Sequence, residues 1–192
     1  MSIQLDKTAL LVVDAQNGFV NEHSQHVIPT IVGLTEQWSA TGRPTVFTRY
    51  WNYEGSPYEN LIGWRALYGP PDTDIVDELI PFTTQPDARL LDKTTYTALT
   101  AEGLALLTEL GVTQLIICGI ATDACVLKTA LDAFEQGYVP WIVQDAVASN
   151  ATRHSAQEIH DSALLHISRL VGAGQVLTAS DIYDAIESTS VA

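Results

Sequence analysis

Six short apolar runs recur along the chain, with longer stretches of helical periodicity between them. The runs cover residues 9–13, 45–48, 89–91, 115–118, 139–143 and 175–177. They are continuous rather than alternating, which is typical of parallel strands covered on both faces. Each is far shorter than the roughly 20 residues that cross a bilayer, so we interpret them as buried strands.

The stretches between the runs predict amphipathic helices, because apolar residues recur there at i, i+3 and i+4. They cover 27–41, 100–110, 123–136 and 152–170, and a glycine follows each within two residues. This alternation predicts an α/β fold, a three-layer α/β/α Rossmann-like arrangement with a central, mainly parallel sheet of about six strands. No repeat or linker interrupts it, so we expect residues 1–192 to form a single domain.

The segment 50–86 breaks this alternation. A long connection inside a compact domain is usually functional or disordered, and the aromatic content of this one favours order. We predict that it forms a lid or pocket wall, with a packed surface excursion or an oligomer contact as the alternative. Its aromatic residues include Trp51, Tyr53, Tyr58, Trp64 and Tyr68.

Composition narrows the range of partners. The chain has 192 residues, 23 acidic residues against nine basic ones, and a formal net charge of −14. This balance argues against nucleic acid or an anionic membrane, because both bind clustered lysine and arginine. The N-terminus shows no signal-peptide pattern, and two cysteines cannot build a disulfide framework. We therefore expect a soluble, cytoplasmic protein.

Reactive residues follow several of the predicted strands, and ligands of open α/β sheets bind beyond the carboxyl ends of strands. Cys125 opens a predicted helix, where the dipole lowers the pKa of a thiol and backbone N–H groups suit a developing oxyanion. Asp14 could take the thiol proton, and Lys93 would favour the thiolate. These three residues are a candidate nucleophile, base and cationic organiser.

Each of these residues also has a structural interpretation. A lone cysteine is often a small buried apolar residue, and Cys118, inside an apolar run, is interpreted in that way. A lone aspartate after a strand is often a helix cap or turn residue, which is our interpretation of Asp123 and Asp145. A lone lysine is often a solvated surface charge.

Three motifs occur in a familiar order. They are LVVDAQNGF at 11–19, DKTTYTA at 92–98 and CGIATDACV at 118–126. With them the chain resembles the isochorismatase-like cysteine hydrolases. This superfamily includes nicotinamidases, N-carbamoylsarcosine amidases, biuret and ureidoacrylate amidohydrolases, and isochorismatase. The resemblance extends from the first predicted strand to the last.

The resemblance implies a catalytic triad of Asp14, Lys93 and Cys125. Cys125 would attack the carbonyl, Asp14 would carry the proton to the leaving nitrogen, and Lys93 would hold both. A thioester would form and be hydrolysed by water. Backbone N–H groups of Ala121 and Cys125 would form the oxyanion hole, and the family's non-proline cis peptide bond is expected at Ile120–Ala121.

The resemblance also implies pocket residues and an assembly. Ordinary packing is the alternative for Phe19 and Tyr96, whereas Trp64 and Arg65 would close the pocket or face a neighbouring subunit. A homo-oligomer, dimer or tetramer, is expected. The pocket candidates are Gln16, Phe19, Trp51, Tyr53, Tyr96 and Ile120.

The sequence departs from the nicotinamidase pattern at the metal motif. Nicotinamidases carry Asp-x-His after the second strand, whereas Tyr50 and Asn52 stand at these positions here. Neither residue is a good zinc ligand, so we expect no metal and no cofactor. The histidines lie elsewhere, in positions typical of a helix or loop surface: His23, His26, His154, His160 and His166.

The sequence therefore predicts a metal-independent cysteine amidohydrolase, a hydrolase of non-peptide C–N bonds that acts on a small carboxamide or ureido compound. One alternative is an isochorismatase-type vinyl ether hydrolase that uses Asp14 without a covalent intermediate. Another is a catalytically silent member that binds a small molecule or serves as a scaffold. Nucleotide binding is disfavoured, because no G-x-G-x-x-G follows the first predicted strand.

Overall fold

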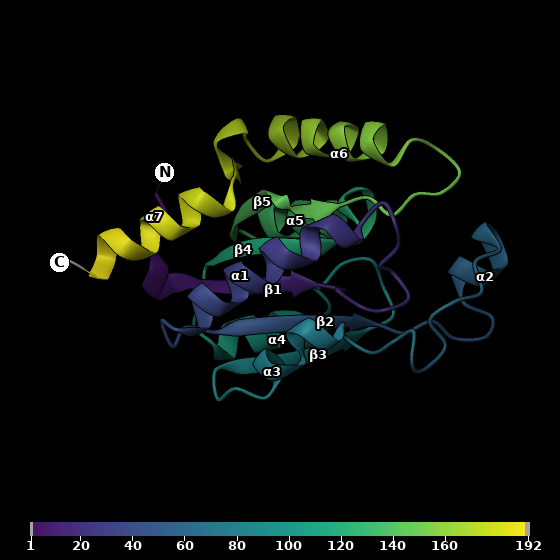
Figure 1. Ribbon diagram of the computed structural model, residues 1–192, viewed down its shortest axis with the longest axis horizontal. Helices are drawn as coiled ribbons and strands as arrows, with labels where there is room; N and C mark the ends of the chain where they lie inside the picture. The colour runs from purple at the N-terminus through teal and green to yellow at the C-terminus, as the bar shows by residue number, and fades with distance from the viewer. Residues whose placement is uncertain (1, 191–192) are drawn as a thin grey trace.

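The computed structural model describes residues 2–190, and its strands form one parallel sheet (Figure 1). The sheet order is β3-β2-β1-β4-β5-β6. Every predicted apolar run overlaps one strand, so the expected α/β fold with a central parallel sheet is confirmed. The strands are β1 (Thr8–Val13), β2 (Thr45–Tyr50), β3 (Ala88–Lys93), β4 (Gln114–Ile120), β5 (Val139–Ala148) and β6 (Val176–Leu177).

The four predicted helices correspond to α1, α4, α5 and α6, and a π-helical turn (Thr122–Val126) precedes α5. The pattern did not indicate α2 and α3, which are too short to show a period, or α7. None of the described helices is long and apolar enough to cross a membrane. The helices are α1 (Ile28–Ser39), α2 (Pro57–Ile62), α3 (Ile80–Thr83), α4 (Ala101–Glu109), α5 (Leu127–Glu135), α6 (Ala156–Leu170) and α7 (Ala179–Ser190).

Two apolar cores lie on opposite faces of the sheet. Helices α1 and α7 cover one face, where Trp38 and Ile182 are buried, and α4, α5 and α6 cover the other (Figure 1). Within β1, Leu10 belongs to the first core and Leu11 to the second. Because both faces are covered, β1 is buried at every position, which explains its uninterrupted apolar sequence.

The site is positioned by the reversal of strand order in the middle of the sheet. The chain runs from β1 outward to β2 and β3, and from β4 outward in the other direction to β5 and β6. The adjacent carboxyl ends of β1 and β4 therefore open a crevice, as in other doubly wound sheets. Asp14 follows β1 directly, and the π-helical turn follows β4.

The aromatic-rich segment is ordered and extends past the carboxyl ends of the strands, where α2 stands away from the sheet (Figure 1). Asn52 anchors it, since its Oδ1 accepts hydrogen bonds from Ser56 Oγ (2.6 Å) and the Tyr53 N–H (3.0 Å). Its Nδ2 donates to the Trp64 carbonyl (3.2 Å). Ser56 also caps α2 by accepting from the Glu59 N–H. These local bonds fix the part of the segment that lies beyond the end of β2.

A close approach of β1 and β4 gives the first testable prediction. Gly119 has φ +122°, and a Cβ there would lie 1.9 Å from the Val13 carbonyl oxygen. We expect Gly119→Ala to lower the free energy of unfolding, measured by urea denaturation, by at least about 2 kcal/mol, because strain and overpacking add. Gly42→Ala is the control. Gly42 has φ +68° and open space around it, so the loss should be only about 1 kcal/mol. Equal losses would contradict the argument.

Candidate active site

A buried ion pair joins the ends of β1 and β3. Lys93 Nζ lies 2.6 Å from Asp14 Oδ2, and neither side chain has any exposed surface (0%/0%). Lys93 also donates to the carbonyls of Thr95 (2.9 Å) and Tyr96 (3.1 Å). The other Asp14 oxygen, Oδ1, accepts from Thr48 Oγ1 at 2.5 Å. Both buried charges are therefore compensated and hydrogen-bonded, which fixes the carboxylate in one orientation.

The backbone explains how two residues from non-adjacent strands meet. Asp14 has φ +48°, a left-handed conformation that turns the chain sharply as it leaves β1. Lys93 is the last residue of the edge strand β3, and its long side chain crosses the end of β2. On the way its Nζ lies 5.6 Å from the centre of the Tyr50 ring. The salt bridge therefore joins two strands that do not pair with each other.

Cys125 completes the cluster from the π-helical turn after β4. Its side chain is nearly buried, and its thiol is hydrogen-bonded to the Asp14 carboxylate and to the backbone of Ala121. The Ile120–Ala121 peptide bond is cis, at the position that the family resemblance implies. The structure thus brings Asp14, Lys93 and Cys125 together.

The electrostatics of the thiol differ from the expectation. Burial raises the pKa of Cys125 well above its ordinary value, and the adjacent negative charge of Asp14 raises it further. Lys93 and the Ala121 backbone act in the opposite direction but do not prevail. The expected lowering of the pKa at a helix start is therefore wrong, because burial and the charge of Asp14 outweigh the effects of Lys93 and the Ala121 backbone. The resting group is a thiol hydrogen-bonded to a base.

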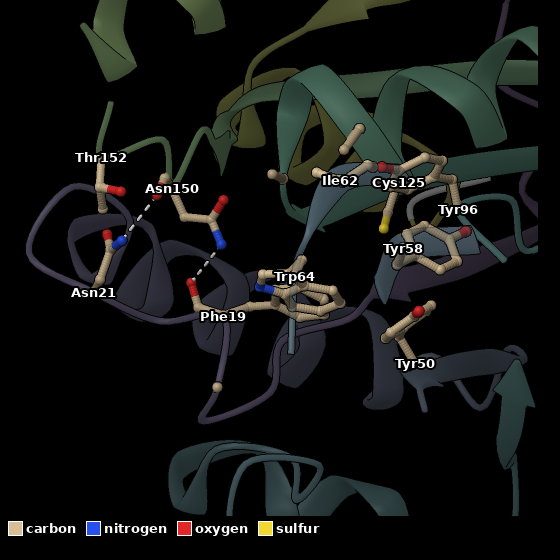
Figure 2. Close-up of a pocket in the computed structure, with 13 residues that line it drawn as sticks. Phe19, Asn21, Tyr50, Tyr58, Ile62, Trp64, Tyr96, Cys125, Asn150 and Thr152 are labelled. Atoms are coloured by element: carbon tan, nitrogen blue, oxygen red, sulfur yellow. Dashed lines mark hydrogen bonds between the residues drawn. The ribbon is translucent and has the colours of Figure 1, made fainter. Parts of the chain in front are cut away.

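A cavity of about 330 Å³ opens beside Cys125 (Figure 2). Its aromatic walls come from three parts of the chain, and Figure 2 shows the Cys125 sulfur directed into the space between them. The opposite end is polar and is formed by Asn21, Asn150 and Thr152. The aromatic side chains are Phe19, Tyr50, Tyr58, Trp64 and Tyr96.

The aromatic rings contact one another as well as the cavity. Phe19 and Trp64 stack with centroids 5.9 Å apart and an interplanar angle of 12°. Tyr58 packs edge-on against Tyr96 at 4.9 Å and against Tyr50 at 5.2 Å. Tyr58 and Trp64 belong to the aromatic-rich segment, so the prediction that this segment forms a pocket wall is confirmed.

Of the six pocket candidates from the sequence, Phe19 and Tyr96 line the cavity. Gln16 does not, because it is completely buried and its amide holds the backbone. Its Nε2 donates to the carbonyls of Tyr50 (3.0 Å) and Thr73 (2.8 Å), and its Oε1 accepts from the Tyr50 N–H (2.7 Å). Gln16 therefore positions Tyr50 instead of meeting a ligand.

The other three candidates also lie away from this cavity. Ile120 is fully buried in the core between the sheet and α1. Tyr53 is 48% exposed, and Trp51 lines a separate shallow hollow beside Asp92 and Thr94. In the sequence, the positions of Tyr58 and Trp64 carried no periodic signal that would have distinguished them from Trp51 and Tyr53.

The residues at the metal-motif positions do not suit a zinc ion. The Tyr50 hydroxyl donates to Asn52 Oδ1 at 3.3 Å, and burial raises the pKa of that hydroxyl, which keeps it neutral. The Asn52 amide is already occupied by the hydrogen bonds that anchor the aromatic-rich segment. Within residues 2–190, no three His, Cys, Asp or Glu side chains are placed to hold a metal ion.

Three further polar residues can be compared with their interpretation from the sequence. His160 is half-buried, and not an open surface residue: its ring Nδ1 lies 2.9 Å from Thr122 Oγ1, and burial lowers its pKa. Asp145 is a cap, as predicted, although of a distant helix, since its Oδ1 accepts from the Ala179 N–H at the start of α7. Asp123 Oδ1 is buried without a hydrogen-bond partner among the described residues.

Comparison with known proteins identifies the family of this chain. The isochorismatase domain matches residues 8–179, so the chain belongs to the isochorismatase family of hydrolases. An isochorismatase-family protein of Bacillus subtilis strain 168, PncA, is 30% identical over 183 residues, covering 87% of this chain and 97% of that protein.

Solved structures agree with this assignment. The crystal structure of nicotinamidase PncA from Bacillus subtilis has a TM-score of 0.78 at 28% identity, covering 89% of this chain and 99% of that one. A cysteine hydrolase from Pseudomonas syringae pv. phaseolicola 1448A has a TM-score of 0.81 at 22% identity, covering 97% and 95% of the two chains. The second likeness shows the shared fold.

The thiol chemistry can be tested by alkylation. We expect iodoacetamide to alkylate Cys125 near neutral pH more slowly than it alkylates a free thiol, since the raised pKa leaves little thiolate. Asp14→Asn should raise that rate by roughly tenfold, because it removes the repelling charge while Lys93 remains. The measurement is mass spectrometry in a Cys118→Ala background. An unchanged or lower rate in Asp14→Asn would show that Asp14 does not hold the thiol protonated.

Proposed function

We propose that this protein is a cysteine-dependent amidohydrolase that cleaves a C–N bond of a small carboxamide or ureido compound. The observation that carries the proposal is the Cys125 thiol, which lies at the cavity wall and is hydrogen-bonded to an ion-paired Asp14. A thiol beside a fixed base can lose its proton as it attacks a carbonyl. The nicotinamidase among the similar structures supports C–N hydrolysis as the reaction type.

In the first half of the reaction, the Cys125 sulfur bonds to the carbonyl carbon while Asp14 takes the thiol proton. The carbonyl electron pair moves onto oxygen, where the N–H groups of Ala121 and Cys125 stabilise the charge. When the intermediate collapses, the C–N bond breaks and Asp14 delivers the proton to the leaving nitrogen. Ammonia or an amine leaves, and an acyl or carbamoyl thioester remains on Cys125.

In the second half, water attacks the thioester and Asp14 accepts a proton from that water. The C–S bond breaks, the proton returns to sulfur, and the acid product leaves. Lys93 is a positioning residue in both halves, since its three N–H donors are used by Asp14 Oδ2 and by the carbonyls of Thr95 and Tyr96. It keeps the carboxylate aimed at the sulfur and compensates its charge.

A vinyl ether hydrolysis by Asp14 without a covalent intermediate is the competing reaction type. It would need the carboxylate to face the substrate directly. Asp14 instead has no exposed side-chain surface and does not line the cavity, whereas Cys125 does. The arrangement favours attack by the Cys125 sulfur, with the Asp14 carboxylate as the base that takes the thiol proton.

The nucleophile can be tested with the two cysteines of the chain. We expect Cys125→Ser to lower amide turnover by at least about 1,000-fold, because a serine hydroxyl is a far weaker acid and nucleophile than the thiol. Cys118→Ala is the matched control and should retain turnover per folded molecule, since Cys118 is fully buried in β4. Intact-mass spectrometry after rapid quenching should find the acyl adduct on Cys125 alone. Undiminished turnover in Cys125→Ser would establish the non-covalent alternative.

Independence from metal is a separate prediction. Because Tyr50 and Asn52 do not suit zinc, dialysis against excess EDTA should leave amide turnover unchanged. Turnover is measured before and after dialysis, with added Zn²⁺ as the control for recovery. A loss that Zn²⁺ restores would contradict the prediction.

A further inference from the structure

The lack of charged side chains in the cavity wall, among residues 2–190, carries an inference about the substrate. We propose that this site takes uncharged, flat amides and discriminates against amides that carry a carboxylate, such as carbamoyl amino acids. The inference rests on the proposed function and narrows its substrate class. The sequence left carboxamides and ureido compounds, charged or neutral, equally open.

No charged side chain lines the cavity within the described residues 2–190. Its wall consists of aromatic, small apolar, amide and hydroxyl groups together with the Cys125 thiol. The catalytic ion pair does not supply a cation to a ligand, because Lys93 is neutralised by Asp14 at 2.6 Å and has no exposed side-chain surface (0%). A carboxylate that entered would lose water without gaining a counter-ion.

The arginines that are nearest to the lining residues in the sequence do not supply a cation to the cavity. Arg65 follows the lining residue Trp64, but its side chain is 74% exposed and lies 3.0 Å from Glu59. Arg153 follows the lining residue Thr152 and is exposed, and it does not line the cavity. The formal net charge of −14 adds a field that disfavours the approach of anions.

The aromatic walls select shape as well as charge. Phe19 and Trp64 present stacked, nearly parallel rings, and Tyr58 and Tyr96 stand nearly perpendicular to each other (86°) next to the thiol. Flat groups stack on aromatic rings through dispersion and apolar burial, whereas the partial negative charge of the ring faces repels anions. An aromatic or conjugated amide fits such walls.

In the proposed complex, the polar end of the cavity contacts the part of the substrate that lies farthest from the reacting carbonyl. Asn150 Nδ2 donates to the Phe19 carbonyl (3.0 Å), and Asn21 Nδ2 donates to the Asn150 carbonyl (2.9 Å), so both side chains are held in place (Figure 2). Asn150 Oδ1 and Thr152 Oγ1 have no hydrogen-bond partner among the described residues. They can accept from a neutral N–H or O–H of the substrate.

Two benzamides of matched size test the charge preference. They are 4-carbamoylbenzoate, which is anionic, and 4-(hydroxymethyl)benzamide, which is neutral. We expect kcat/KM for the neutral amide to exceed that for the anion by at least about 100-fold, because an unpaired charge in an apolar wall is strongly rejected. N-carbamoylglycine and its neutral amide form a second pair with the same expected order.

Engineering the polar end provides the converse test. Thr152→Arg adds a cation at the exposed mouth of the cavity, and we expect it to shift the neutral-to-anionic ratio of kcat/KM toward the anion by about tenfold or more. Thr152→Gln is the control of similar length without charge, so the effect of the added cation is the difference between the ratios of the two variants. Arg153→Gln should also leave the ratio unchanged, because Arg153 lies outside the cavity wall.

Binding separates this inference from the proposed function. Calorimetry with Cys125→Ala measures affinity for the same pairs when the nucleophile is absent. Tighter binding of the neutral compounds supports the inference. It does so even if the wild-type protein turns over none of these amides, a result that would contradict the proposed function. Equal or tighter binding of the anions would overturn the inference, even if both benzamides are hydrolysed. An Arg153→Gln variant that loses anion binding would identify Arg153 as the missed cation and would likewise overturn it.

Discussion

The salt bridge between Asp14 and Lys93 is the interaction on which the site depends. Both side chains are fully withdrawn from water, so removing either partner would leave an uncompensated buried charge, at a cost of about 3–5 kcal/mol. The pair joins the ends of β1 and β3, although β2 lies between them. It fixes the carboxylate that faces the Cys125 thiol, so one interaction serves both folding and the proposed chemistry.

The second constraint is the close approach of β1 and β4. Gly119 permits it, because any side chain there would meet the Val13 carbonyl. Asp14 follows β1 and the π-helical turn follows β4, so both lie at the site once the two strand ends lie together. The aromatic-rich segment then adds the wall opposite the thiol, and the hydrogen bonds of Asn52 hold the part of it that lies beyond β2.

Part of this arrangement could be predicted from local pattern. The apolar runs identify the strands because a strand covered on both faces needs apolar residues at every position, as β1 shows. The polar residues after the runs are therefore expected at one edge of the sheet. The pocket wall was predicted less well. Trp51 and Tyr53 have the same composition signal as Tyr58 and Trp64, yet only the latter pair lines the cavity.

The sequence by itself determined the α/β fold, the order of its strands along the chain, and the family motifs that contain Asp14, Lys93 and Cys125, because these follow from periodicity and residue identity. Tertiary structure decided what depends on burial and long-range contact. Gln16 became a backbone anchor because Tyr50 and Thr73 surround it. The pKa of the Cys125 thiol is raised because of burial and the nearby charge of Asp14, neither of which a local sequence pattern reports.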